Sequence, residues 1–149
     1  MTLCGVDDSM TLPIPLVFSP ASDTMLHCLL VFLGGGIGSL CRYGIQHIGI
    51  SGASFLYTLT ANISGCLAIG IIWALLDAWH ADKAWNLLLI TGLLGGYTTF
   101  SAFSLDVVQL IQAGKALTAA AYVAASVLGG PAACGIGLYA TQRIIRIFA

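Results

Sequence analysis

The sequence predicts an all-α membrane protein with four transmembrane helices, the third of them broken. Three observations support this fold class: the composition, four apolar segments of spanning length, and a cluster of small and polar residues inside the third segment. Hydrophobic residues make up 58% of the chain, charged residues 7%, and the mean hydropathy is +0.97. Because a soluble domain averages about a quarter charged residues, this chain could not cover its own surface with polar groups.

Four segments are long enough to cross a bilayer, at about 20 mostly apolar residues each. They are residues 26–46, 55–76, 85–111 and 116–138. Backbone groups in lipid must be satisfied within the segment, so each is expected to be a helix. The connections are short, which predicts that consecutive helices run antiparallel and pack as neighbours.

Residues 1–24 differ from the rest of the chain. They contain three of the four prolines, three of the six acidic residues and no basic residue. They lack the positive start and continuous apolar core of a secretory signal. We expect a disordered extension over 1–24, with Met25 as the hypothesised true start, and a four-helix transmembrane domain over 25–149.

The first span contains the motif GGGIGSLCRYG. Gly34 and Gly38 are four residues apart, which favours close contact with another helix. Arg42 lies about 16 residues into the helix, so it is either an intramembrane charge with a functional role or a side chain that reaches toward the helix end.

The second and fourth spans each carry polar residues. Asn62, in TLTANISG, is near the middle of the second span, and its amide must find a partner, either a neighbouring helix or a ligand. Tyr122 and Ser126 are four residues apart and therefore share one face of the fourth helix. Their hydroxyls could line a path or pack against Asn62.

The third span contains GLLGGYTTFSAFS, in which Gly95 and Gly96 precede two β-branched threonines. Both features weaken a helix, and nearby hydroxyls can satisfy backbone groups that a break releases. Those hydroxyls belong to Thr99, Ser101 and Ser104. Irregular backbone at membrane depth is tolerated only inside protein or along a cavity, so a break implies a site. Its carbonyls could bind a cation, and its N–H groups and hydroxyls an anion.

Phe100 and Phe103 follow the break and project from one face. The edges of their rings carry partial positive charge and could contact an anion weakly. The alternative is that both rings are ordinary core packing.

Basic residues predict the orientation only weakly. Lys83, Arg143 and Arg146 lie on the side of the termini, against Lys115 on the other, with Arg42 inside or near the end of the first helix. Such a small bias favours cytoplasmic termini modestly and allows insertion in both orientations, in which case an antiparallel homodimer follows. Four helices leave little room for an aqueous path, so transport would arise at or beside a subunit interface.

Three motifs together, GGGIGSLCRYG, TLTANISGCLAIG and TGLLGGYTTFSAFSLDVV, resemble the CrcB/Fluc fluoride channels over essentially all of residues 25–149. The resemblance implies a fluoride efflux channel in the bacterial inner membrane. It further implies a dual-topology, antiparallel homodimer with two pores and a structural sodium ion in the dimer interface.

The resemblance also implies roles for particular residues. The sodium would be held by the backbone carbonyls of Gly95 and Thr98 from both subunits. The fluoride pathway would include Asn62, Phe100, Phe103, Tyr122, Ser126 and, near its entrance, Arg42. The hydroxyls of Thr99, Ser101 and Ser104 belong to the same expected pathway. Three positions depart from the usual pattern: Tyr57, Ala102 and Gly130.

Other functions are less well supported by the sequence. A small multidrug-type, proton-coupled exporter needs an intramembrane carboxylate, usually in the first span, whereas here Asp106 in the third span is the only intramembrane acid. A non-transporting membrane scaffold subunit would not need a broken helix. Five basic residues are too few for a nucleic-acid-binding face, and no catalytic or metal-ligand motif indicates an enzyme.

Overall fold

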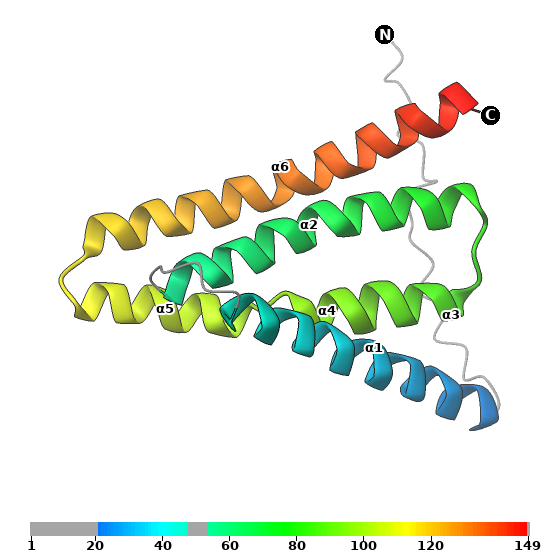
Figure 1. Cartoon of the computed structure of the whole chain (residues 1–149), viewed down its shortest axis with the longest axis horizontal. Helices are drawn as coiled ribbons and strands as arrows, with labels where there is room; N and C mark the ends of the chain where they lie inside the picture. Colours follow the sequence, from blue (N-terminus) through cyan, green and yellow to red (C-terminus); the bar gives the residue numbers. More distant parts are fainter. Residues whose placement is uncertain (1–20, 48–53, 149) are drawn as a thin grey trace, which may run out of the picture.

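The computed structural model describes residues 21–47 and 54–148 and is entirely helical there (Figure 1). Within this part of the chain, four helical segments are long and apolar enough to cross a membrane. They are Asp23–His47, Ser54–Ala78, Lys83–Gln112 and Ala116–Phe148. The four spans expected from the sequence are therefore confirmed, and the protein is a multi-pass membrane protein.

The helix bounds differ from the expected ones mainly at the two ends of the chain. The helix α1 covers Ala21–His47, so it includes the last four residues of the stretch expected to be an extension; residues 1–20 lie outside the described part. The helix α2 covers Ser54–Ala78.

The helix α6 covers Ala116–Phe148 and continues well past position 138, where the apolar run ends. Arg143 and Arg146 end the hydrophobic pattern but not the helix, because neither glycine nor proline follows to stop it. Pro131 lies inside this helix, as membrane helices tolerate.

The third span consists of several pieces. They are α3 (Lys83–Trp85), the π-helix η2 (Asn86–Leu94), α4 (Gly95–Tyr97) and α5 (Phe100–Gln112). Thr98 and Thr99 between α4 and α5 have extended torsions, with φ and ψ of −83° and 157° at Thr98 and −154° and 121° at Thr99. Gly95 keeps helical torsions, −62° and −36°. The interruption thus lies on the two β-branched threonines, which favour extended backbone, and not on the glycines.

The helices pair in a way that the short connections did not predict. Consecutive spans run in opposite directions, as expected, but α1 packs mainly along η2 and α4, and α2 mainly along α6 (Figure 1). Contacts between α1 and α2 are few. The expectation that consecutive helices are the closest neighbours is therefore wrong for the first pair.

Glycines explain the close pairing of α1 with the third span. A Cβ atom at Gly34 or Gly38 would collide with backbone atoms of η2, and one at Gly96 would collide with the backbone of Gly35. Small residues at a helix contact let two backbones approach closely, which drives helix association in lipid. Gly96 therefore serves the packing of two helices, which agrees with its helical backbone conformation inside α4.

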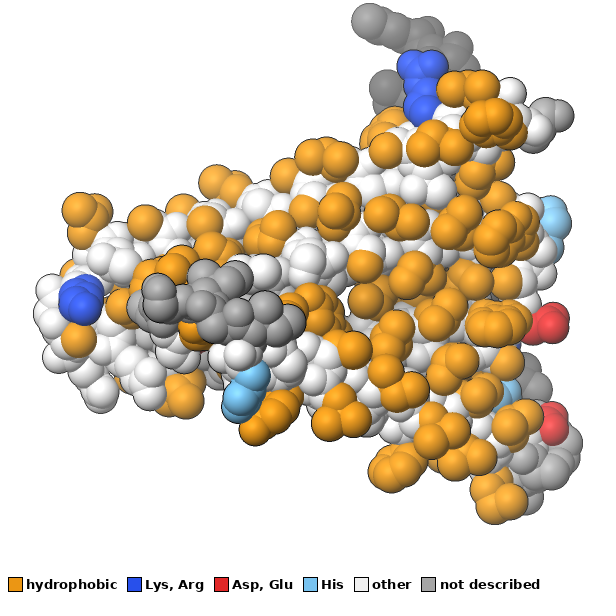
Figure 2. Space-filling model, viewed as in Figure 1, with side chains coloured by type: hydrophobic (Ala, Val, Ile, Leu, Met, Phe, Trp, Pro, Cys, Tyr) orange, Lys and Arg blue, Asp and Glu red, His pale blue; other side chains and the backbone are white. Residues whose placement is uncertain are grey.

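Large apolar side chains cover most of the outside of the protein. Figure 2 shows them along the length of the molecule, with charged side chains gathered toward its two ends on this face. Among the described residues, no large side chain is fully buried, whereas Phe32, Leu117 and Phe148 are at least 75% exposed. Such a surface is suited to lipid or to another apolar protein surface.

Candidate functional site

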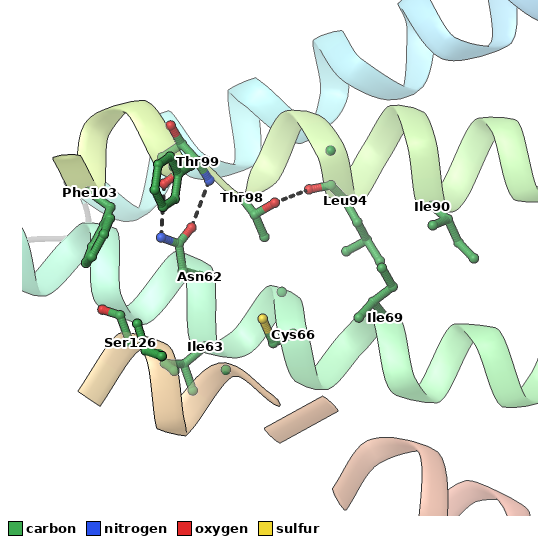
Figure 3. Close-up of a pocket in the computed structure, with 15 residues that line it drawn as sticks. Asn62, Ile63, Cys66, Ile69, Ile90, Leu94, Thr98, Thr99, Phe103 and Ser126 are labelled. Carbon is green, nitrogen blue, oxygen red and sulfur yellow. Dashed lines mark hydrogen bonds between the residues drawn. The ribbon is translucent and has the colours of Figure 1, made fainter. Parts of the chain in front are cut away.

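Asn62 on α2 holds the backbone of the interruption. Its Nδ2 donates a hydrogen bond to the carbonyl oxygen of Thr99 (3.0 Å), and the amide nitrogen of Thr99 donates to its Oδ1 (2.8 Å; Figure 3). The two bonds replace helical partners that Thr99 cannot have in an extended conformation. Asn62 therefore has the partner that a mid-span amide requires, and that partner is main chain.

Two backbone amides at the interruption donate to side-chain oxygens and not to helical carbonyls. In a continuous helix the amide of Thr99 would donate to the carbonyl of Gly95, and the amide of Ala102 to that of Thr98. Here the Thr99 amide donates to Asn62, and the Ala102 amide donates to Oγ1 of Thr99 at 3.3 Å. The carbonyls of Gly95 and Thr98 thus lose their helical donors.

Thr99 caps the start of α5, and its hydroxyl also lies 3.0 Å from that of Ser101. This N-cap is the arrangement that threonine commonly provides. Thr98 bonds back to the end of η2, because both its amide and its hydroxyl donate to the carbonyl of Leu94 at 2.9 Å.

Arg42 lies on the other side of the third span, against α4. Its Nε donates to the carbonyl of Gly96 at 3.2 Å, and the Ser39 hydroxyl donates to the same oxygen at 3.4 Å. Arg42 is not among the residues that line the cavity described next.

A cavity of about 380 Å³ lies beside the interruption, between α2, α6 and the third span (Figure 3). Among the described residues, none that lines it carries a charge. The lining residues are Asn62, Ile63, Gly65, Cys66, Ile69, Ile90, Leu94, Gly95, Thr98, Thr99, Phe100, Phe103, Ser126, Val127 and Gly130. Seven residues singled out from the sequence as pathway or cation-binding residues meet here, from α2, the third span and α6.

The two phenylalanines of α5 form a ring pair at the cavity. The ring centroids of Phe100 and Phe103 are 5.4 Å apart and the rings are tilted by 41°. Phe100 is 78% exposed, whereas Phe103 packs on the buried ring of Tyr122 at 5.2 Å. Only Phe103 is thus partly core packing.

The hydroxyls expected to form a track are engaged locally. Ser126 donates to the carbonyl of Tyr122, and Ser104 donates to that of Phe100, each at 2.9 Å. A hydroxyl has one hydrogen, so each must rotate to donate elsewhere. Of the expected pathway residues, Arg42, Tyr122, Ser101 and Ser104 do not line the cavity.

Asp106 has partners that the sequence did not reveal. It is 6% exposed; the Ser54 hydroxyl donates to its Oδ1 at 3.3 Å, and the Tyr122 hydroxyl donates to its Oδ2 at 3.4 Å. The carboxylate therefore links α2, α5 and α6. Asp106 is the only acidic residue inside the third span, and this was the sequence signal that could have indicated a buried partner.

Ser64 and Tyr97 were also missed. Their hydroxyl oxygens are 2.8 Å apart, which joins α2 to the last residue of α4. Ser64 is a polar residue inside an apolar span, only two positions after Asn62, and this was the signal that could have identified it.

Comparison with known proteins places this arrangement in a family. The model of the CrcB-like protein, camphor resistance (CrcB) family matches residues 29–138. A fluoride-specific ion channel FluC of Rhizobium etli is 42% identical over 125 residues, covering 81% of this chain and all of the relative. Proteins of the same name from Hyphomonas neptunium and Desulfotalea psychrophila are 43% and 33% identical. These two matches cover 78% and 83% of this chain and 95% and 98% of the relatives. The resemblance found in the three motifs is thereby confirmed, and the chain belongs to the CrcB-like family.

Proposed function

We propose that this protein is a fluoride-selective ion channel of the bacterial plasma membrane. It would let fluoride leave the cell down its electrochemical gradient and so reduce cytoplasmic fluoride toxicity. Its relatives carry the name fluoride-specific ion channel. The observation that carries the proposal is the uncharged cavity at the interruption, which combines an amide, hydroxyls and two phenyl rings.

This lining suits a small and strongly hydrated anion. Such an ion needs hydrogen-bond donors to replace its water, but a fixed positive charge would hold it too tightly for conduction. Asn62 has two hydrogens on Nδ2, and its bond to Thr99 uses one. We assign the second as a donor to fluoride, with the ring edges of Phe100 and Phe103 as weaker contacts.

The remaining pathway residues have supporting roles in this proposal. Thr99, Ser101, Ser104 and Ser126 offer hydroxyls that can rotate from their present partners toward a passing anion. Tyr122 supports the ring of Phe103 from behind, and Arg42 attracts anions from outside the narrow part of the path. A negative cell interior would drive the anion outward.

We further propose that the channel is an antiparallel homodimer whose two copies insert in opposite orientations. Phe100 is 78% exposed in the single chain although it lies at the cavity, which leaves the site incomplete without a second surface. The weak bias of basic residues is compatible with both orientations.

A structural sodium ion is also part of the proposal. Hard cations prefer oxygen ligands, and the carbonyl groups of Gly95 and Thr98 are two main-chain oxygens whose helical donors are diverted. Both residues line the same cavity. Two copies would supply four such carbonyl oxygens, a ligand set that suits a sodium ion, and the ion would join the subunits by coordinating oxygens from both.

Fluoride efflux from proteoliposomes, followed with a fluoride electrode, tests the proposed function. We expect rapid fluoride efflux and little chloride efflux, without dependence on a proton gradient. Uptake of a drug-like cation driven by protons would instead support an exporter. Failure to move any of these solutes would support a scaffold role and refute the channel.

A further inference from the structure

The interruption of the third span packs directly against α2 at Gly65. A Cβ atom at Gly65 would collide with the methyl group of Thr98 and approach the ring of Tyr97 to 3.2 Å. The absence of a side chain at Gly65 therefore lets Tyr97 and Thr98 rest directly on α2.

Two hydrogen-bonded contacts, at Asn62 and at Ser64, lie on opposite sides of α2. Asn62 lines the cavity beside the interruption, whereas Ser64 lines a separate cavity of about 450 Å³ together with Thr60 and Leu67. Residues two apart on a helix point in nearly opposite directions, which agrees with this placement. Asn62 binds Thr99 after the break, and Ser64 binds Tyr97 before it.

The hydroxyl of Ser64 is itself held in place. It lies 2.6 Å from the carbonyl of Thr60 and 3.3 Å from that of Ala61, so its hydrogen is directed to its own helix. In that arrangement Ser64 accepts the hydrogen bond at 2.8 Å, and Tyr97 donates it. Tyr97 is half-buried, so water competes only in part for this bond.

We propose that Ser64 and Tyr97 form a second clamp, which positions the main-chain carbonyls of Gly95 and Thr98 for cation binding. Tyr97 lies between these two residues in the chain. Both carbonyls have lost their helical donors, and the segment changes from helical to extended backbone between them, at Thr98. A side-chain bond from Tyr97 therefore holds the point at which their relative position is set. Tyr97 and Ser64 are positioning residues here and do not touch the ion or the fluoride.

This inference rests on the sodium site of the proposed function, and its test uses sodium binding as the readout. The purified protein is heated in a series of sodium chloride concentrations, with ionic strength held constant by N-methylglucamine chloride. The sodium concentration that gives half of the maximal rise in unfolding temperature is then compared between variants. A purely structural defect would lower the unfolding temperature at every sodium concentration without moving this half-saturation point.

We expect Tyr97→Phe and Ser64→Ala each to raise the half-saturating sodium concentration by about fivefold, equivalent to one ordinary hydrogen bond. The double variant should show no larger shift, because both changes remove the same bond. Ser64→Thr keeps the hydroxyl and should behave as the unchanged protein. Thr60→Ala is the matched control. The Thr60 hydroxyl lies on the same side of α2 as Ser64 but bonds only to the carbonyl of Leu56 in its own helix.

Unchanged sodium half-saturation in Tyr97→Phe and Ser64→Ala, or additive shifts in the double variant, would overturn the clamp. If one variant does not fold, the other tests the same bond. The clamp would also be overturned if the unfolding temperature of the unsubstituted protein did not depend on the sodium concentration. Fluoride efflux from the same preparation then decides separately whether the proposed channel function stands.

Discussion

The side chain of Asn62 and the main chain of Thr99 bind each other through two hydrogen bonds, of 3.0 and 2.8 Å. One residue of α2 thus satisfies both backbone groups of an extended residue in the third span. The same amide lies in the wall of the cavity. Stability and ion passage are therefore expected to depend on one side chain.

Asn62→Ala should impair both properties. It leaves the amide and the carbonyl of Thr99 without partners, and each unsatisfied buried group costs about 1–3 kcal/mol. We expect a lower unfolding temperature in detergent and no fluoride efflux in proteoliposomes, with the dimer still assembled on size-exclusion chromatography. Normal efflux from this variant would remove Asn62 from the pathway.

Phe100→Ile should separate function from stability. The ring is 78% exposed in the single chain and is paired there with the ring of Phe103, so its replacement should lower the free energy of unfolding by no more than about 1 kcal/mol. An aliphatic side chain has no positively polarised ring edge, so fluoride efflux should be abolished. Leu105→Ile, at another exposed position of α5, is the control and should conduct normally. Equal efflux from both variants would count against a role for the ring.

Much of this architecture follows from the sequence because the membrane restricts the choices. A chain with so few charges must bury its backbone polar groups in helices, so the four spans could be predicted. The glycine and threonine cluster indicated an interruption, and Asn62, Phe100 and Phe103 do meet at one cavity. Sequence spacing gives the face of a helix on which a residue lies.

Spacing does not give the neighbour that the face meets. The pairing of α1 with the third span depends on close backbone contact at Gly34, Gly38 and Gly96, which short loops do not encode. For the same reason the partners of Asp106 and Tyr97 could not be predicted, because each partner lies on another helix. The interruption lies at Thr98 and Thr99 and not at the glycines, which agrees with the packing of Gly96 against Gly35.

Gly38→Ala should destabilise the protein, whereas Gly36→Ala should not. A Cβ atom at Gly38 would collide with the backbone of Leu93, but among the described residues nothing lies within 4 Å of one at Gly36. Overpacking at Gly38 should cost about 1–3 kcal/mol in the free energy of unfolding. At Gly36, replacing glycine by alanine, the better helix former, should gain up to about 1 kcal/mol. Chemical unfolding in detergent measures both. A similar effect of the two substitutions would mean that α1 does not contact the third span through this face.

Asp106→Asn should weaken the fold and spare conduction. The new amide can accept through only one oxygen, so it cannot serve both the Ser54 and the Tyr122 hydroxyls as the carboxylate does. We expect a loss of about 1–3 kcal/mol in the free energy of unfolding. Because Asp106 does not line the cavity, fluoride efflux per folded protein should remain close to normal. Asp77→Asn, at an exposed position near the end of α2, is the matched control and should change neither property. If Asp106→Asn keeps its unfolding temperature and loses efflux, the carboxylate acts on the ion path and the structural role given to it here is wrong.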